Sequence, residues 1–361
     1  MKITKIEAHQ IETPRYYGHI SGHLIVKVYV DEGPVGLGEA SDSRATDVSA
    51  VVNNYRKLLV GRPAENITEI NELLRAHRFN SSVTDMHLAS AIDIALYDLN
   101  AKAQGVSTYQ LLGGKMRERL YCCYPIFGWQ VTEDFEKAGG YLQRLIDLGH
   151  HLFRYYVSGD CQLDDRFLTE MKSRHGDRIK LKQLDFSGRF RDWESALRYA
   201  DGLRHHEPYH FEQPSNSMRV SAQFTQRMDL PVSRHINSLE DGYLAAEMGA
   251  CTAFNVACVS GGPTHIRRLF ALAEAAGLGC LIGTDQESTL GTAAQVAVGI
   301  AMPNVTLPCD PMGPVLYTTS PAVERMRAEG SYLYPFDGPG LGVELDAKKM
   351  ASMTVESACE L

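Results

Sequence analysis

The sequence lacks any long hydrophobic run, any cluster of basic residues and any Cys-x-x-Cys pair, and each absence excludes a class of protein. Its longest apolar stretches, such as residues 88–96, are interrupted well short of the roughly 20 residues that cross a bilayer. Residues 1–5 lack the apolar segment of a signal peptide, so we expect a cytoplasmic protein without a membrane partner. Because Lys and Arg do not cluster and the net charge is −8, we expect no nucleic-acid partner and predict a small-molecule substrate.

Cysteine is present, but without the spacing of a metal or redox site. Most of the eight cysteines lie in apolar segments typical of strands, where a free thiol packs as a small hydrophobic side chain. We therefore predict reduced, structural cysteines, as is usual in the cytosol. They are Cys122, Cys123, Cys161, Cys251, Cys258, Cys280, Cys309 and Cys359.

The amino-terminal part of the chain has the pattern of an α+β domain. Hydrophobic residues alternate as in antiparallel strands at residues 3–11, 23–30 and 35–39. Apolar residues then recur at helical spacing, most strongly at residues 85–104. Strands followed by helices predict an α+β domain, to which we assign residues 1–118.

From residue 119 the pattern changes to short β-rich segments separated by amphipathic helices. The starts of successive segments are 22 to 32 residues apart, which is about one strand, one helix and two loops. The eight predicted strands are residues 120–126, 152–157, 179–184, 209–211, 231–235, 253–257, 279–282 and 305–307. This spacing predicts an α/β fold, a parallel barrel over residues 119–320, followed by a segment, 321–361, that returns to the first domain.

Two acidic residues close consecutive predicted barrel strands. Asp185 follows the third strand and Glu212 follows the fourth. Because active sites of parallel barrels lie at the carboxyl ends of the strands, both carboxylates are predicted to face one site. Either acid alone would more simply cap a helix or pair with a cation. Together they favour a Mg²⁺ site, since Mg²⁺ takes few hard oxygen ligands and keeps waters that a substrate can replace.

Six short motifs occur in a characteristic order along nearly the whole chain. They are ASAIDIALYDLNAK at residues 89–102, LLGG at 111–114, EQP at 212–214, GG at 261–262, GTDQES at 283–288 and GPGLG at 338–342. In this order the sequence resembles the enolase superfamily, and within it the mandelate racemase/muconate lactonizing enzyme family. The resemblance implies a capping domain over a modified TIM barrel of (β/α)7β type, assembled as a homo-oligomer. It also implies Mg²⁺ that steadies an enolate, formed when a base removes the proton next to a substrate carboxylate.

The chain departs from the family pattern at the second and fifth barrel strands. Where the family has Lys-x-Lys, this chain has Arg154 and Tyr156 on one strand face. Arginine can hold a carboxylate but cannot act as a base, whereas tyrosine can exchange a proton if nearby cations lower its pKa. Tyr156 could equally be an aromatic filler of the barrel. Where the family has a third acidic metal ligand, the chain has Arg234 and His235. His235 can bind the metal, carry a proton or be structural, and Arg234 can supply positive charge.

The remaining candidates lie on the sixth and seventh strands and in an early loop. The family's second base falls near Val256, so it is absent here, and Glu287 occupies the register of a Glu that helps to bind or polarise the substrate. Asp285 is a further substrate-binding candidate, although we favour a structural ion pair with Arg154 or Arg234. His19 and His23 lie in a Gly-rich loop that resembles a lid or an ordinary hairpin.

Two other pairs of residues carry no predicted role. We expect Lys180 and Lys182 to face outward although they imitate Lys-x-Lys, and His205 and His206 to be exposed at a turn.

Three functions are compatible with these residues. The first is an enolate-forming lyase or isomerase, of dehydratase or cycloisomerase type, acting on a small carboxylate such as an acid sugar. In it, Asp185, Glu212 and His235 hold Mg²⁺, and Tyr156 or His235 moves the proton. The second is a metal-independent enzyme in which Arg154 and Arg234 stabilise an anion. The third is a binding scaffold without catalysis, because fold does not guarantee function.

Overall fold

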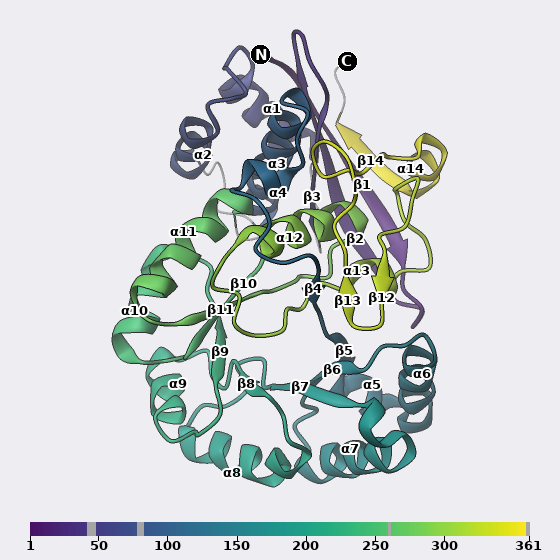
Figure 1. The fold of residues 1–361 in the computed structure, drawn as a ribbon, viewed down its shortest axis with the longest axis vertical. Helices are drawn as coiled ribbons and strands as arrows, with labels where there is room; N and C mark the ends of the chain where they lie inside the picture. The colour runs from purple at the N-terminus through teal and green to yellow at the C-terminus, as the bar shows by residue number, and fades with distance from the viewer. Residues whose placement is uncertain (42–47, 78–82, 259–260, 359–361) are drawn as a thin grey trace.

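The computed structural model describes residues 1–41, 48–77, 83–258 and 261–358, which form a sheet-and-helix cap above a curled parallel sheet (Figure 1). The cap sheet has the strand order β14-β1-β2-β3 and is antiparallel. Its strands are β1 (Ile3–Pro14), β2 (Ile20–Val30), β3 (Gly36–Ser41) and β14 (Thr354–Ala358). The cap helices are α1 (Val48–Leu59), α2 (Ile67–Ala76), α3 (Val83–Ala103) and α4 (Thr108–Leu111).

Helix α3 lies directly on strand β3 because two glycines remove the side chains between them. A Cβ atom built on Gly38 would lie 1.8 Å from the carbonyl oxygen of Ala91, and one on Gly36 would lie 2.2 Å from that of Ala95. No other residue type allows this approach. The contact buries Ala91 and Ala95 in a cap core of their own, separate from the barrel core.

The barrel sheet has seven parallel strands in chain order, and it confirms the predicted modified barrel. They are β5 (Tyr124–Phe127), β6 (Leu152–Tyr156), β7 (Lys180–Asp185), β8 (His210–Glu212), β9 (Val232–His235), β10 (Ala253–Val256) and β11 (Gly279–Ile282). The helices that follow β5 to β11 are α5 (Gly128–Glu133), α6 (Phe135–Asp147), α7 (Cys161–His175), α8 (Trp193–Leu203), α9 (Met218–Thr225), α10 (Leu239–Met248), α11 (Gly262–Ala275) and α12 (Thr289–Ala301). Two 3-10 turns, η1 (Gly176–Arg178) and η2 (Arg204–His206), lead into β7 and β8.

The eighth predicted strand, residues 305–307, is present only as isolated bridges. Val305 pairs with Cys280 of β11, and Cys309 pairs with Cys122 on the other side of the gap. Pro303, Pro308 and Pro311 punctuate this segment, and proline has no N–H to donate to a strand ladder. The predicted first strand likewise divides, because β4 (Leu120–Tyr121) joins β12 (Ala328–Glu329) and β13 (Tyr332–Leu333) in a small separate sheet.

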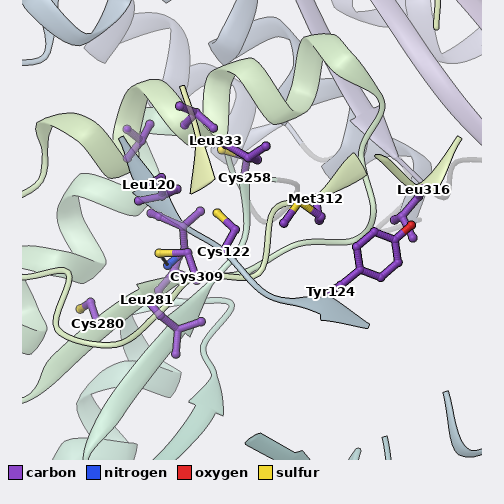
Figure 2. Packing of buried hydrophobic residues seen from close by; sticks show 14 of the residues in the cluster. Leu120, Cys122, Tyr124, Cys258, Cys280, Leu281, Cys309, Met312, Leu316 and Leu333 are labelled. Atoms are coloured by element: carbon purple, nitrogen blue, oxygen red, sulfur yellow. Dashed lines mark hydrogen bonds between the residues drawn. The ribbon is translucent and has the colours of Figure 1, made fainter. Parts of the chain in front are cut away.

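The remaining described elements, α13 (Gly313–Leu316) and α14 (Ala347–Met353), follow the barrel and lead back to the cap, where β14 pairs with β1. None of the described helices is long and apolar enough to span a membrane. The seven described cysteines are free, as predicted, and several pack with leucines where the barrel closes (Figure 2). Cys359 lies outside the described residues.

Two buried carboxylates of the cap are bonded to backbone groups of the barrel. Glu39 of β3 accepts hydrogen bonds from the Ser288 backbone N–H at 2.5 Å and the Gly291 N–H at 2.8 Å. Asp93 of α3 accepts bonds from the Thr264 N–H and hydroxyl, at 2.8 and 2.9 Å. A carboxylate buried at such a joint must keep its donors, because leaving it unsatisfied is costly. These bonds therefore fix the cap over the open ends of the barrel strands.

Candidate active site

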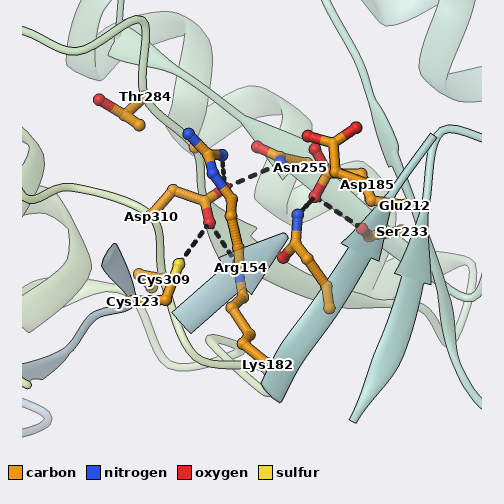
Figure 3. Close-up of polar contacts among 12 residues, drawn as sticks. Cys123, Arg154, Lys182, Asp185, Glu212, Ser233, Asn255, Thr284, Cys309 and Asp310 are labelled. Atoms are coloured by element: carbon orange, nitrogen blue, oxygen red, sulfur yellow. Dashed lines mark hydrogen bonds and ion pairs between the residues drawn. The ribbon is translucent and has the colours of Figure 1, made fainter. Parts of the chain in front are cut away.

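Three side chains at the carboxyl ends of neighbouring strands form the centre of the site. Asp185 ends β7, Glu212 ends β8 and His235 ends β9. The strand register places Asp185 opposite Glu212, and Glu212 opposite Ser233, so the acids lie side by side (Figure 3). The strand ends therefore bring together the two acids and the histidine, as the sequence predicted.

Glu212 makes most of the polar contacts in this group. Its Oε1 lies 2.9 Å from Nε2 of His235, and its Oε2 accepts hydrogen bonds from the Gln183 amide and, at 3.2 Å, from the Ser233 hydroxyl. Burial opposes its charge, but His235 and the buried cations Lys182 and Arg154 hold the pKa of Glu212 well below its usual value. Burial alone would lower the pKa of His235, yet the Glu212 carboxylate raises it to about 9. At neutral pH the two residues form an ion pair.

Asp185 is buried beside this ion pair and is less well stabilised as an anion. Its Oδ1 accepts hydrogen bonds from the Ser187 backbone N–H at 2.8 Å and from the Ser187 hydroxyl at 3.1 Å. Burial, and then the charge of Glu212, raise the pKa of Asp185 to about 7. Two adjacent buried carboxylates that repel each other are an arrangement that a divalent cation stabilises.

The donor set fits Mg²⁺. Two carboxylates suffice for an ion that usually keeps several waters. Among the described residues, a single group of three His, Cys, Asp or Glu side chains has all its ligand atoms within 4.8 Å of one another, and it does not include Asp185, Glu212 or His235. The ligand atoms of these three residues are therefore spread more widely. His235 Nε2 faces Glu212 with a proton. Asp185 and Glu212 would hold the ion, and His235 would join them only after releasing that proton.

A buried ion cluster that the sequence analysis missed lies beside the acid pair. The Asp310 carboxylate contacts the Lys182 ammonium, Arg154 NH1 at 3.2 Å, the Asn255 amide at 3.0 Å and the Cys123 thiol at 3.2 Å (Figure 3). All of these side chains are buried. Asp310 lies three residues beyond the predicted eighth strand, 305–307, so the sequence analysis did not identify it as the acid that follows that strand.

The prediction that Lys182 faces outward is wrong. The register between β6 and β7 shifts at this point, since Phe153 pairs with Leu181 whereas Arg154 pairs with Gln183. This bulge places Lys182 inside, with no solvent exposure. Strand alternation could not reveal it, because a bulge adds one residue to the count.

Arg154 and Tyr156 lie together as predicted, but the environment of Tyr156 does not favour a base. The Arg154 guanidinium lies 4.6 Å from the centre of the Tyr156 ring, which stacks on Phe127 at 4.7 Å. Burial raises the pKa of Tyr156, Arg154 lowers it in part, and Asp185 and Glu212 raise it again. The net pKa is well above the usual value, so the condition under which Tyr156 could act as a base, a lowered pKa, is not met. Tyr156 therefore holds its proton at neutral pH and can donate it.

The loop after the seventh strand, β11, carries the buried Glu287. Burial and the nearby charge of Asp285 raise the pKa of Glu287 to about 8. Its Oε2 accepts a 2.6 Å hydrogen bond from the Thr284 hydroxyl, whereas Oε1 is buried without a hydrogen-bond partner. A protonated carboxyl of this kind can donate to a substrate oxygen. Asp285 is exposed nearby, and its negative charge raises the pKa of both Glu287 and His235.

The structure places His23 and Arg234 outside this cluster. His23 is fully buried in the cap, with Nδ1 3.0 Å from Glu39. The Arg234 guanidinium donates to the backbone carbonyls of Ser215 and Asn216, at 2.7 and 3.0 Å, and so braces the loop after β8. The predicted partner of Arg154 is also different, because its ion pair is with Asp310.

Two adjoining cavities open beside the site. One, of 460 Å³, is lined by Phe127, Trp129, Tyr156, Ser158, Ser187 and Arg189 at the strand ends. The other lies beneath the early cap loop and includes His19, together with the same Phe127 and Trp129. This second cavity has a volume of about 10 Å³, so the space beside His19 holds about one water molecule and is too small for a substrate.

Comparison with known proteins agrees with this architecture. Residues 15–113 match the family model of the mandelate racemase/muconate lactonizing enzyme N-terminal domain, and residues 139–349 match the enolase C-terminal domain-like model. Chloromuconate cycloisomerase CbnB of Cupriavidus necator is 26% identical, covering 93% of this chain and 92% of that protein. L-Ala-D/L-Glu epimerase of Clostridium acetobutylicum is 27% identical, covering 89% and 90%. The solved muconate lactonizing enzyme from Pseudomonas putida has the same fold, with a TM-score of 0.85 at 24% identity over 98% of this chain and all of that one.

Proposed function

The chain belongs to the mandelate racemase/muconate lactonizing enzyme family of the enolase superfamily, and we propose that it is an enolate-forming cycloisomerase or dehydratase acting on a small carboxylate. The relatives named above are enzymes, cycloisomerases and epimerases. The observation that carries the proposal is the buried pair of Asp185 and Glu212 at adjacent strand ends, with the pKa of Asp185 raised to about 7.

The reaction begins when the proton next to the substrate carboxylate moves to Nε2 of His235, after His235 has released its own proton to solvent. When bound by Asp185 and Glu212, Mg²⁺ supplies positive charge to the developing enolate. Tyr156 and Glu287 hold their protons at neutral pH, because burial raises the pKa of both. We propose that they donate to the enolate oxygen or carbon, or to a leaving hydroxyl group. Arg154 keeps positive charge beside Tyr156 and orients its ring.

Proton transfer from one face of the substrate fits the side chains better than racemisation. Racemisation by two bases needs a second proton carrier across the site. On β10 the polar side chain is Asn255, whose amide is bonded to Asp310 and does not titrate. Cycloisomerisation and dehydration each need one proton carrier, so we propose these reactions.

A metal-independent enzyme is the second candidate, and one observation favours it. Arg154 is fully buried, and its Nε and NH2 atoms have no hydrogen-bond partner within the described part of the chain. Such a group can hold a substrate anion without a metal. Arg234 does not share this role in our proposal, because backbone carbonyls occupy its guanidinium.

Hydrogen exchange in D₂O tests the first proposal. Purified protein is incubated with a panel of acid sugars, N-acyl amino acids and unsaturated diacids, with Mg²⁺ or with EDTA, and deuterium at the carbon next to the carboxylate is followed by NMR. We expect Mg²⁺-dependent exchange that Asp185→Asn and Glu212→Gln abolish. The exposed Glu194→Gln on α8 is the matched control and retains exchange.

Binding of Mg²⁺ itself, measured by calorimetry, separates the two candidates without a known substrate. Millimolar or tighter binding that Asp185→Asn removes supports the first. Absence of Mg²⁺ binding in the wild-type protein overturns it and leaves the Arg154 enzyme. We also infer a cytoplasmic location, because the seven described cysteines are unpaired and a reducing compartment maintains free thiols. Assembly as a homo-oligomer stays a prediction.

A further inference from the structure

Three side chains with metal-binding atoms converge between helix α7 and the turn that precedes β8, apart from the candidate active site. Asp165 lies on α7, and His205 and His206 lie in the turn η2, which leads into the first residue of β8. Asp165 Oδ1 is 2.9 Å from Nε2 of His205 and 2.9 Å from Nε2 of His206. In the part of the chain that the structure describes, no other three His, Cys, Asp or Glu ligand atoms lie as close together.

The turn η2 directs two consecutive histidine side chains toward the same carboxylate oxygen of Asp165. Helix α8 ends at Leu203, the turn η2 follows, and Glu207 reverses the chain in the left-handed conformation, with φ of 58°. The two imidazole centres are 4.1 Å apart. The His206 side chain is only 5% exposed, so the prediction of an exposed pair is wrong for this residue, whereas His205 is 57% exposed. One side of the cluster is therefore fixed by packing and the other is open to solvent.

We propose that Asp165, His205 and His206 form a structural Zn²⁺ site. One carboxylate oxygen and two imidazole nitrogens are the donors that Zn²⁺ prefers, and a water completes a tetrahedral set. Ligands about 2.0–2.1 Å from a tetrahedral zinc lie roughly 3.3 Å from each other, so the 2.9 Å separations here need only a small expansion. Mg²⁺ is a poor alternative, because it favours oxygen ligands. The neighbouring Lys172 does not leave an excess of positive charge, since it pairs with Glu207 at 2.9 Å.

The bound ion connects two consecutive units of the barrel. It joins α7 to the connection that positions β8, and β8 ends in Glu212 at the other face of the barrel. In parallel barrels the amino-terminal face contributes to stability, whereas the carboxyl-terminal face carries catalysis. The site would therefore stabilise the barrel and take no part in the reaction.

The chain contains its own matched control. A second His-His pair, His150 and His151, precedes β6 in the same way that His205 and His206 precede β8. His150 and His151 pack against aromatic rings, of Tyr124 and of Tyr121 and Tyr332 respectively, and they belong to no cluster of three ligands among the residues placed in the structure.

The experiment is a calorimetric titration of untagged, EDTA-stripped protein with Zn²⁺, after removal of the chelator and in saturating Mg²⁺ to occupy the active site. We expect one equivalent of Zn²⁺, bound with micromolar or higher affinity and accompanied by a rise in melting temperature. Asp165→Asn and His206→Gln should abolish this binding. His205→Gln should weaken it about tenfold or more, and because His205 is exposed this variant will fold even if His206→Gln does not. The double variant His150→Gln/His151→Gln should bind as the wild type does.

Three results would overturn the proposal. The first is wild-type protein that binds no Zn²⁺ in the presence of Mg²⁺. The second is binding that Asp165→Asn and His205→Gln leave unchanged. The third is binding that is lost only in Cys161→Ser, since this partly exposed thiol lies one turn before Asp165 on α7 and would then be the ligand.

Discussion

Replacing Asp310 with Asn should destabilise the protein by about 3–5 kcal/mol, because breaking a buried ion pair leaves its partners as uncompensated buried charges. Asp310 faces two buried cations, Lys182 and Arg154, and each contacts a different carboxylate oxygen. Burial disfavours the charged form of each of these groups, but the groups stabilise one another. Asp310 raises the pKa of Lys182, and Lys182 lowers the pKa of Asp310. With an unfolding entropy of about 2.1 cal/mol/K per residue over 361 residues, this loss corresponds to a fall in Tm of ~4–7 °C.

Equilibrium unfolding in urea, followed by circular dichroism, gives the free energies. The decisive comparison is Lys182→Met in two backgrounds. In the wild type it removes a cation that is paired with Asp310 and should destabilise. In Asp310→Asn it removes an unpaired cation and should restore part of the lost stability. The exposed Asp201→Asn on α8 serves as the control and should change stability by less than about 0.5 kcal/mol. A loss below about 1 kcal/mol for Asp310→Asn, or equal effects of Lys182→Met in both backgrounds, would refute this reasoning.

Three further predictions concern other buried carboxyl groups. Burial raises the pKa of Asp93 to about 6, so its protonation stabilises the folded state fully below about pH 4 and no longer above about pH 6. In urea unfolding, the stability of the wild type relative to Asp93→Asn should therefore fall by about 3 kcal/mol between pH 4 and 7. A difference that stays constant with pH would contradict this prediction. Glu287 is protonated at neutral pH, so Glu287→Gln should keep most exchange activity at pH 7 while Glu287→Ala loses about 100-fold; equal losses would mean that the ionised form is needed. Glu39→Gln leaves His23 without its partner and should cost about 1–3 kcal/mol in urea unfolding, and an unchanged midpoint would show that the joint between cap and barrel does not depend on this charge.

The sequence predicted those parts of the site that follow the regular repeat of strand and helix. Asp185, Glu212 and His235 close apolar strands, so their meeting at one edge follows from the parallel arrangement alone. The pairing of Arg154 with Tyr156 follows in the same way from alternation along one strand.

What the sequence could not predict depends on departures from that repeat. Lys182 is turned inward by a bulge, which no count along a single strand detects. Asp310 lies three residues beyond the predicted strand 305–307, in a segment whose prolines leave only isolated bridges, so it was not identified as the acid that follows that strand. His23 pairs with Glu39, and Glu39 in turn accepts a hydrogen bond from Ser288 at the start of α12. These are tertiary contacts, for which the local sequence gives no signal.

The direction of a pKa shift was also beyond sequence reasoning. The sequence left open whether nearby cations lower the pKa of Tyr156, and Arg154 does lie against the ring. Burial and two carboxylates outweigh it, and their sum is known only once the side chains are placed.

The pairing of β14 with β1 has a consequence for how the protein is made. The cap sheet takes its fourth strand from residues that follow the whole barrel, so a ribosome that has completed β1 to β3 must still synthesise the barrel before the edge of β1 is covered. During that time β1 presents an open strand edge, which is the kind of surface on which nascent chains pair wrongly with one another. The barrel strands can pair as they emerge, whereas the fourth strand of the cap sheet can pair only after the barrel has been synthesised. The cap sheet is therefore completed after the barrel, although its first three strands are made before the barrel.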